Sequence, residues 1–332
     1  MRRVVTATIS PGGYGKTALS LSEAIAMAVA GLRVWYISGE DDKDEIDRRI
    51  AAYCQHHKIS QLALADRLFV DDRDSYPIKI AKEGRNQTVE FDEPQLKAFE
   101  DRIRNDKIDV AIFDPFVRFH SCAETNQVFD AIVDRLGKIC IAQNCNVEID
   151  HHTRKIAPGQ EITVDDARGG GALVNSARSC RVLNRMTSDE ADQARISKSD
   201  RERYLKICNG KRNMAPAEDA KWFRLASVYI PNGDNVQAVE PWDFPKVFAE
   251  VTIGDQDHFR NLVRTGNYRV DSRSPNWLGH ELAKHYDRDV TVKGDCAWLW
   301  CDVKDSAGAW IYPSPQDPRS APFLRTCARM TG

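Results

Sequence analysis

Short apolar runs alternate with helical patterns over the first two-thirds of this chain. The apolar runs are too short for helices and are typical of buried strands. The expected strands cover residues 4–9, 33–38, 68–70, 109–113 and 147–149. The expected helices cover residues 18–30, 43–57, 94–105 and 126–144. Strands that alternate with helices in this way predict an α/β fold, with a mostly parallel sheet covered by helices on both faces.

The pattern changes from about residue 178 onward. Four short apolar segments predict further strands that extend the sheet, at residues 181–183, 203–207, 222–229 and 236–239. Pro241 and Pro245 then indicate a domain boundary. Two helical patterns follow, at residues 258–265 and 277–286. We therefore expect a sheet domain over residues 1–245 and a small, mainly helical domain over residues 250–332, for which a winged helix is one suitable form.

The composition narrows the class of protein. The chain has 332 residues and a formal net charge of -2, which excludes a generally basic nucleic-acid binder but leaves room for a local basic patch. Its nine cysteines include no C-x-x-C pair, so inert thiols in a reducing compartment are expected. No stretch reaches about 18 consecutive apolar residues, and the N-terminus lacks a signal peptide. We therefore expect a soluble, cytoplasmic protein without a membrane segment.

The segment S-P-G-G-Y-G-K-T at residues 10–17 carries the strongest chemical signal. It lies between an expected strand and an expected helix, which is the setting of a phosphate-binding P-loop. Its glycines let backbone N–H groups approach phosphate oxygens, Lys16 can reach the β- and γ-phosphates, and the Thr17 hydroxyl can ligate Mg²⁺. The usual pattern has glycine where this chain has Ser10. The predicted ATP-binding residues are Pro11, Gly12, Gly13, Tyr14, Gly15, Lys16, Thr17 and Ala18.

Two acidic residues follow expected strands. Asp114 comes directly after the strand at 109–113, where a Walker B aspartate would hold Mg²⁺, although Asp-Pro is also a good turn. Glu40 follows the strand at 33–38 and could accept a proton from the attacking water. Acidic residues at this point could instead favour the start of the next helix, and both roles can hold together.

Polar and basic residues also follow the strand at 147–149. His152 could sense the γ-phosphate through a hydrogen bond, or it could be a structural histidine. Arg168 and Arg178 flank a glycine-rich stretch, and Lys211 follows in N-G-K-R. Each of these cations could reach the nucleotide of a neighbouring subunit, bind a phosphate backbone or lie on a surface loop.

Taken in order, these motifs resemble those of the RecA/DnaB-type hexameric ATPases, and in particular the RepA-type replicative helicases and the AAA-labelled ATPases of plasmids and phages. The matching signatures over residues 4–245 are S-P-G-G-Y-G-K-T, S-G-E-D-D, I-F-D-P-F-V-R-F-H, H-H-T-R-K, R-G-G-G-A-L-V-N-S-A-R and N-G-K-R-N. The resemblance implies a RecA-like fold. Arg212 is a departure, because relatives usually carry a small residue there. Another is the short segment before the first strand, where relatives often have an aromatic and proline-containing stretch.

The resemblance also implies roles for single residues. Lys16 and Thr17 would hold phosphate and Mg²⁺, with Asp114 as the Walker B acid. Glu40 would be the catalytic base, and His152 would sense the γ-phosphate. Three cations would act on the nucleotide of the neighbouring subunit: Arg178 as the arginine finger, Arg168 as the second choice for that role, and Lys211 as a second cation.

The function implied by this resemblance is that of an ATP-hydrolysing motor. We expect a homo-oligomeric ring, a hexamer in the relatives, that uses ATP and Mg²⁺ between protomers and acts as a helicase on single-stranded DNA of a plasmid, phage or integrated element. The alternative is a nucleotide-dependent regulator or loader that recruits replication or repair partners without unwinding. A P-loop kinase fits less well because the sequence has no obvious lid module.

Overall fold

The structure is a computed structural model in which the chain divides into two compact units. The first unit comprises Met1–Ala191 and Ile196–Asp243, and the second comprises Asp192–Arg195 and Phe244–Gly332. Continuous description covers residues 2–85, 88–154, 160–169, 171–194, 196–212 and 220–245, with Lys211 and Arg212 described by their backbone alone. Beyond residue 245 the description is limited to three strands and isolated positions.

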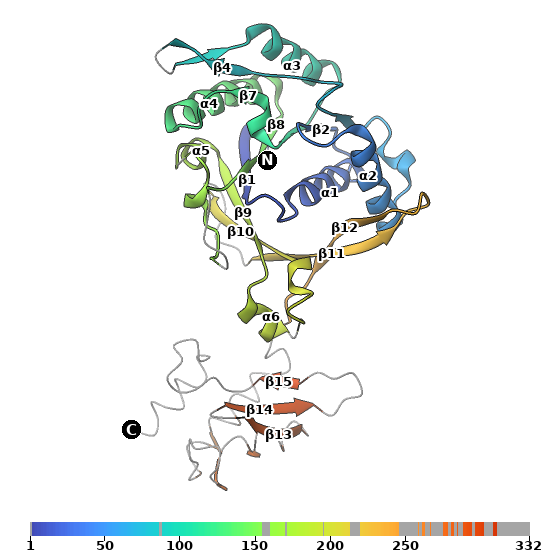
Figure 1. Ribbon diagram of the computed structural model, residues 1–332, viewed down its shortest axis with the longest axis vertical. Helices are drawn as coiled ribbons and strands as arrows, with labels where there is room; N and C mark the ends of the chain where they lie inside the picture. Colours follow the sequence, from blue (N-terminus) through green and yellow to red (C-terminus); the bar gives the residue numbers. More distant parts are fainter. Residues whose placement is uncertain are drawn as a thin grey trace. The chain divides into compact units, whose positions relative to one another are not determined.

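The first unit is built on a nine-stranded sheet with the order β12-β11-β10-β9-β1-β8-β6-β2-β3 (Figure 1). Its strands are β1 Val4–Ser10, β2 Val34–Ser38, β3 Leu68–Asp71, β6 Val110–Asp114, β8 Asn146–His152, β9 Ser179–Arg185, β10 Tyr204–Arg212, β11 Lys221–Tyr229 and β12 Asn235–Trp242. The strands from β3 to β9 in this order are parallel, whereas β10, β11 and β12 continue the sheet antiparallel. The predicted mostly parallel, RecA-like sheet is therefore confirmed.

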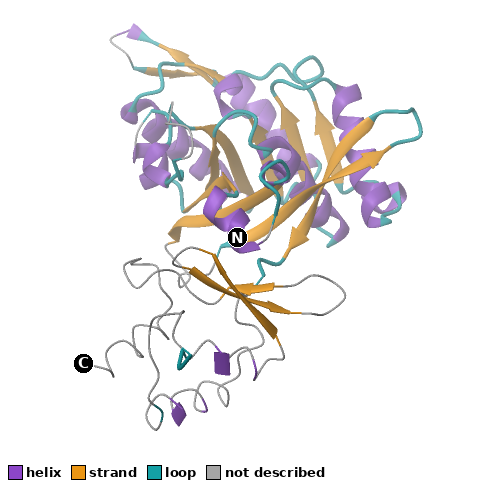
Figure 2. Cartoon of the chain, turned by 60° about the horizontal axis from the view of Figure 1, so that its bottom comes forward, coloured by secondary structure: helices purple, strands orange, loops and turns teal. Residues whose placement is uncertain are grey.

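Helices cover both faces of this sheet, as Figure 2 shows from a second direction. One face carries α1 Lys16–Val29 and α2 Lys43–His57, and the other carries α3 Glu93–Asn105, α4 Asn126–Gln143 and the short α5 Gly171–Ser176. Three of these helices begin at a residue whose side chain accepts a hydrogen bond from a backbone N–H of the first turn. These N-caps are Asp42 for α2, Asp92 for α3 and Thr125 for α4.

Several small elements were not anticipated from the sequence. A second sheet with the order β5-β4-β7 contains β4 Ala81–Glu83, β5 Val89–Phe91 and β7 His120–Ser121, and α6 covers Ser188–Ala194. The 3₁₀ turns are η1 Gln61–Leu64, η3 Phe116–Phe119, η4 Val164–Asp166 and η5 Arg201–Arg203. Most of these pieces are too short to show a period in apolar residues, which is why the pattern along the chain did not reveal them.

The second unit contains an antiparallel sheet of β13 Arg288–Lys293, β14 Cys296–Cys301 and β15 Gly308–Trp310. No strands were expected there from the pattern of the sequence. The helices predicted at residues 258–265 and 277–286 lie largely outside the described residues. The small, mainly helical domain over 250–332 therefore remains a prediction.

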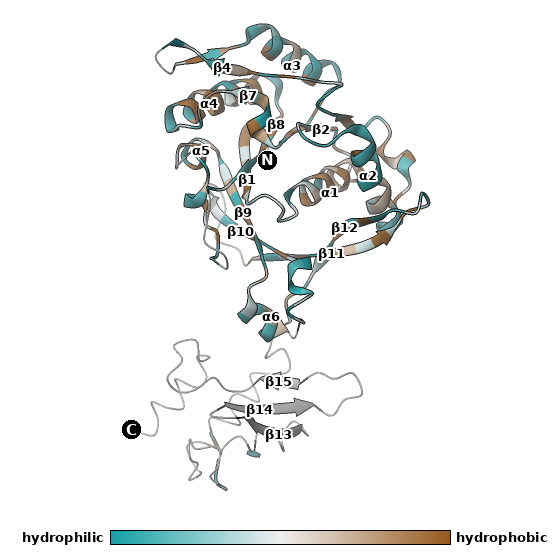
Figure 3. Cartoon of the chain, viewed as in Figure 1, coloured by the Kyte–Doolittle hydropathy of each residue, from teal (hydrophilic) through white to brown (hydrophobic). Residues whose placement is uncertain are grey.

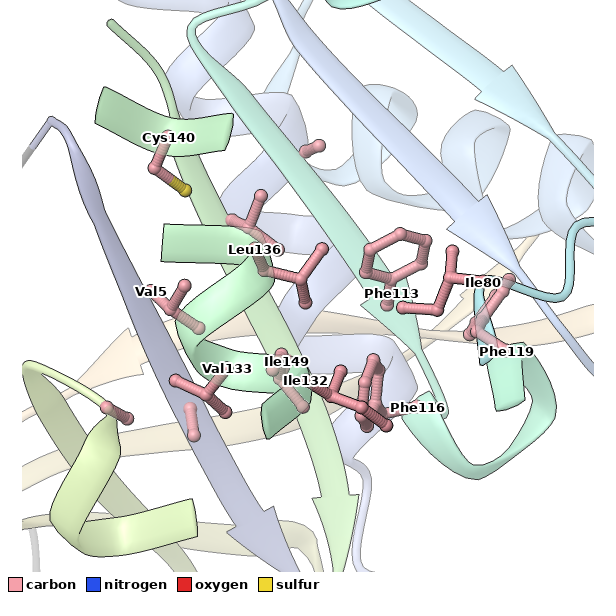
Figure 4. Close-up of a cluster of buried hydrophobic side chains, with 14 of the residues drawn as sticks. Val5, Ile80, Phe113, Phe116, Phe119, Ile132, Val133, Leu136, Cys140 and Ile149 are labelled. Carbon is pink, nitrogen blue, oxygen red and sulfur yellow. The ribbon is translucent and has the colours of Figure 1, made fainter. Parts of the chain in front are cut away.

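The sheet face beneath α3 and α4 holds the main apolar core. Phe113 of β6 and Ile149 of β8 point toward Leu136 and Ile132 of α4 (Figure 4). Aromatic rings continue this layer, with the ring centroids of Phe99 and Phe113 5.2 Å apart. Helix α3 buries three apolar residues at helical spacing and is otherwise largely hydrophilic, as the teal colour of Figure 3 shows. Burial of this stripe fixes α3 on the sheet.

The sheet face beneath α1 is polar along β1 and β8. The Thr8 hydroxyl donates to Glu148 at 2.5 Å, and the Arg181 Nε donates to the Thr8 hydroxyl at 2.7 Å. Arg181 also donates to Glu23 of α1 through its Nη1, at 2.6 Å. These carboxylates raise the pKa of Arg181 although its burial acts in the opposite direction. The network joins α1 to β1, β8 and β9. It also places charged side chains in the interior, close to the end of β1.

Replacing Phe113 by alanine tests the apolar face. Phe113 is fully buried, with its ring centroid 4.6 Å from that of Phe119. We expect Phe113→Ala to lower the free energy of unfolding by about 3–5 kcal/mol, because the transfer free energy is lost and a cavity remains. Urea unfolding followed by circular dichroism measures this change. Leu62→Ala is the control, since Leu62 is 85% exposed, and equal losses in the two variants would contradict the prediction.

Candidate functional site

The segment between β1 and α1 has the geometry of a phosphate cradle. Gly13 and Gly15 have φ of 76° and 91°, in the left-handed region that favours glycine. Gly15 is the residue before the first turn of α1, and no side chain caps this helix. The first backbone N–H groups of α1 are therefore available to an anion. Ser10, where the usual motif has glycine, is the last residue of β1 and needs no such backbone freedom.

Lys16 and Asp114 form a buried ion pair at the start of α1. The Lys16 Nζ lies 3.2 Å from the Asp114 Oδ1, and the two side chains are 6% and 2% exposed. The Tyr36 hydroxyl donates to the other oxygen of Asp114, Oδ2, at 2.6 Å. Burial alone would lower the pKa of Lys16, but Asp114 and Asp150 raise it above its usual value, so the lysine remains charged. The predicted P-loop lysine and Walker B aspartate therefore meet.

Asp150 lies on β8 beside this pair and is fully buried. Neither of its carboxylate oxygens has a hydrogen-bond partner among the described residues, and the same holds for the Ser20 hydroxyl on α1. Burial raises the pKa of Asp150 well above its usual range, and the charge of Asp114 adds to this effect, while Lys16 opposes it. A single lysine thus faces two aspartates in the interior of the site.

Glu40 follows β2 and is held by an exposed arginine. The Arg118 Nε donates to the Glu40 Oε1 at 3.1 Å, and the two side chains are 56% and 46% exposed. The backbone allows this contact because Gly39 has no side chain: a Cβ there would lie 2.4 Å from the Cβ of Arg118. The Gly39 N–H also donates to the carbonyl of Asp114 at 2.8 Å. Glu40 therefore follows a residue whose backbone is hydrogen-bonded to that of Asp114.

The two adjacent histidines of β8 face opposite sides of the sheet. Burial, followed by the charge of Lys16, lowers the pKa of His152, while Glu40 and Asp114 act in the opposite direction. His152 is therefore electrically coupled to the P-loop side. His151 points the other way, with its ring 5.0 Å from that of Phe129 and its Nε2 2.8 Å from the carbonyl of Arg168. Of the pair, His152 is the one on the face expected for a γ-phosphate contact.

The three cations predicted to act between subunits lie in different surroundings. Arg168 pairs with Glu124, with its Nε 2.5 Å from the Oε2, and its side chain is 57% exposed. Arg178 is exposed and precedes β9, where its N–H donates to the carbonyl of Val5 at 2.9 Å. Because Val5 is near the start of β1, Arg178 lies at the opposite end of the sheet from its own P-loop. The backbone of Lys211 pairs with Cys180, and its side chain lies outside the described residues.

Sequence reasoning missed several residues that contact the site. Tyr36 and Asp150 were hidden inside short strands, although a polar residue at every second position of V-E-I-D-H-H was a usable signal of one polar face. Arg118 follows β6 closely, in the sequence F-V-R-F. Arg185, at the end of β9, donates through its Nη2 to the carbonyl of Gly13. No local pattern distinguishes that arginine, because its contact depends on β9 lying beside β1.

Together, these features define the class of the first unit. A strand, a glycine-rich turn and a helix carry a lysine that meets an aspartate at the end of β6, with β8 lying between β1 and β6. This is the arrangement of a P-loop ATPase domain with a RecA-like sheet.

Comparisons with known proteins agree with this assignment. Residues 1–157 match the model of a family described as AAA domain. A solved structure described as an ATPase domain is similar, with a TM-score of 0.50 and 15% identity, over 71% of this chain and 85% of that one. A DnaB-like replicative helicase, described with its interactions with primase, has a TM-score of 0.53 and 16% identity, over 71% of this chain and 59% of that one. The similarity to these two structures shows that the first unit has the same fold as the ATPase domains of DnaB-like helicases.

Within the part of the chain that the structure describes, no helix combines the length and the apolar character that crossing a bilayer requires.

Two buried histidines predict a loss of stability in acid. Burial lowers the pKa of His120 and of His151 to about 4, from the usual 6.5. The folded chain keeps both rings neutral, whereas the unfolded chain takes up protons below about pH 6.5. The free energy of unfolding therefore falls as the pH is lowered from 6.5 toward 4, by about 3 kcal/mol for each histidine. Urea unfolding at several pH values in this window measures the loss.

The variant His120→Leu isolates one of these contributions. Its free energy of unfolding should depend less steeply on pH than that of the wild type over the same window, because one of the two titrating rings is gone. Equal pH dependence in the variant and the wild type would show that His120 takes up its proton over the same pH range in the folded and unfolded chains, which would contradict the prediction.

Proposed function

We propose that this chain is an ATP-hydrolysing, ring-forming motor of the RepA-like helicase kind, acting on single-stranded DNA in the replication or maintenance of a plasmid, phage or integrated element. The observation that carries the proposal is the buried Lys16–Asp114 pair at the mouth of the P-loop, with Glu40 and His152 at the same edge of the sheet. The similarity to a DnaB-like helicase and to an ATPase domain of the same fold supports the choice of motor.

The nucleotide would be held by backbone and side-chain groups of the P-loop. The N–H groups of the loop and of the first turn of α1 would bind the phosphates, and Lys16 would leave Asp114 to reach them. Thr17 and Asp114 offer a hydroxyl and carboxylate oxygens, the donor set that suits Mg²⁺. When bound, this ion neutralises charge on the phosphate oxygens. The residues present therefore fit an ATP–Mg²⁺ complex.

Hydrolysis needs a group that accepts a proton from the attacking water. Glu40 is the proposed base, and its present partner is the exposed Arg118. Exposed ion pairs contribute only about 0–1 kcal/mol, so this contact can be released when a nucleotide occupies the site. His152, kept neutral by burial, would donate a hydrogen bond near the γ-phosphate.

The ring is proposed because an arginine supplied by a neighbouring subunit can accelerate hydrolysis in P-loop ATPases. Arg178 lies at the end of the sheet opposite to the P-loop, so it cannot serve its own nucleotide. It is exposed and therefore free to approach a neighbour. We assign Arg178 as the arginine finger, with Arg168 as second choice and Lys211 as an additional cation. A hexamer is the proposed assembly.

A tyrosine variant tests the proposed metal role of Asp114. Tyr36→Phe removes the hydroxyl that orients the Asp114 Oδ2, so the Mg²⁺ concentration for half-maximal ATP hydrolysis should rise by about tenfold. Magnesium titrations at saturating ATP measure this. Tyr53→Phe, which removes a hydroxyl from α2, is the control. An unchanged Mg²⁺ requirement in Tyr36→Phe would contradict the assignment.

The proposed ring is tested by subunit mixing. Arg178→Ala should reduce kcat by about 10³-fold or more while ATP binding persists, because an arginine finger acts in the transition state. Lys16→Ala should not bind ATP. Mixing the two inactive variants should restore part of the activity, since a Lys16→Ala protomer still supplies Arg178 to the intact P-loop of its neighbour. Arg104→Ala, which removes an arginine 53% exposed on α3, is the control.

The same experiment also measures how ATP turnover depends on oligomer formation and on single-stranded DNA. Turnover per chain should rise with protein concentration and with single-stranded DNA, in parallel with the molar mass from light scattering. A monomer that hydrolyses ATP at full rate, indifferent to DNA and to Arg178, would exclude the motor. Stimulation by DNA without displacement of a strand from a forked duplex would favour a loader or regulator instead.

A further inference from the structure

Arg185 occupies a position beside the P-loop that the proposed mechanism does not use. It is the last residue of β9, and the pairing of Ile9 with Val182 carries the end of β9 past the end of β1. Its Nη2 donates to the carbonyl of Gly13, and its guanidinium carbon lies 4.9 Å from the centroid of the Tyr14 ring. One side chain thus contacts two consecutive residues of the loop.

These two contacts fix one peptide unit of the cradle. A trans peptide directs its C=O and its N–H to opposite sides. When Arg185 holds the carbonyl of Gly13, the N–H of Tyr14 in the same peptide must point away from Arg185. Gly13 has φ of 76° and no side chain, so this peptide could otherwise rotate easily. Arg185 therefore restricts the rotation of the Gly13–Tyr14 peptide that a glycine at position 13 would otherwise allow.

The surroundings of Arg185 favour this single orientation. Its side chain is 29% exposed, and its Nη1 lies 3.3 Å from the Oε2 of Glu202, which is 65% exposed. Its Nε is buried and has no hydrogen-bond partner among the described residues. The planar guanidinium lies near the ring of Tyr14, an arrangement in which an arginine cannot be replaced by lysine without loss.

We propose that Arg185 is a positioning residue of the P-loop in its own chain: it sets the Gly13–Tyr14 peptide in the orientation that binds phosphate before the nucleotide arrives. This inference rests on the proposed binding of ATP at the P-loop. It assigns Arg185 a different role from Arg178, because pre-ordering a loop changes affinity, whereas a finger changes the rate of the chemical step.

The test measures binding separately from turnover. Isothermal calorimetry gives the Kd of ATP and of inorganic pyrophosphate, each with Mg²⁺, for the wild type, Arg185→Ala and Arg185→Lys. We expect Arg185→Ala to weaken both ligands by about tenfold, and Arg185→Lys to recover part of the loss, because lysine keeps one donor but not the planar contact with Tyr14. In steady-state hydrolysis, KM should rise with little change in kcat.

Two further variants distinguish positioning from a general loss of structure. Arg203→Ala removes a neighbouring exposed arginine that pairs with Asp200, and it should bind both ligands like the wild type. Tyr14→Ala combined with Arg185→Ala should cost less than the sum of the single losses, because both act on the same peptide. Thermal unfolding checks that all variants fold.

The outcomes separate this inference from the proposed function. If the wild type binds neither ligand, the proposed function fails. If the wild type binds both and Arg185→Ala binds them equally well, only the role of Arg185 is wrong. A loss confined to ATP, with pyrophosphate unaffected, would place Arg185 at the base or sugar. A fall in kcat at unchanged KM would make it a transition-state group, and both of these results overturn the proposal.

Discussion

The ion pair between Lys16 and Asp114 is the constraint on which the arrangement of the site depends. A lysine 6% exposed needs a counter-charge, because an isolated charge in a protein interior is costly. That counter-charge comes from a strand two positions away in the sheet, so β1, β8 and β6 must keep a fixed register. A slip of one residue would turn Asp114 into the apolar layer beneath α4 and leave the lysine unpaired. The same strand register therefore places Asp114 beside Lys16 on one face of the sheet and the apolar residues in the core on the other face.

The elements of the fold that depend on local sequence were predictable. Helix α2 covers the residues that apolar spacing indicated, and the P-loop was recognisable from its glycines, its lysine and the strand and helix around it. Tyr36 and Arg185 were not recognised, because each reaches the site through the order of strands in space. Asp150 was missed although the alternation in V-E-I-D-H-H indicated a polar face on its strand. Register also distinguishes two histidines that the sequence presents as equals: His152 faces the P-loop, and His151 faces Phe129.

Some basic residues near the site form ion pairs within this chain, and others are proposed to act on a neighbouring subunit. Arg181 is satisfied by Glu23 and by the Thr8 hydroxyl, and its role is to join α1 to the sheet. Arg168 is engaged by Glu124. Burial and pairing therefore make Arg181 a structural cation, whereas Arg168 is 57% exposed and remains the second choice for the arginine finger.

Strand β9 carries basic residues at both of its ends: Arg178 immediately before it and Arg185 as its last residue. Seven residues at about 3.3 Å each make a rod roughly 23 Å long. Hydrogen bonds to β1 on one side and to β10 on the other prevent this rod from bending independently. In the proposed ring it would link two successive nucleotides, one at each end. A displacement of Arg185 at one end of this strand would then also move Arg178, the residue that the protomer offers to its neighbour at the other end.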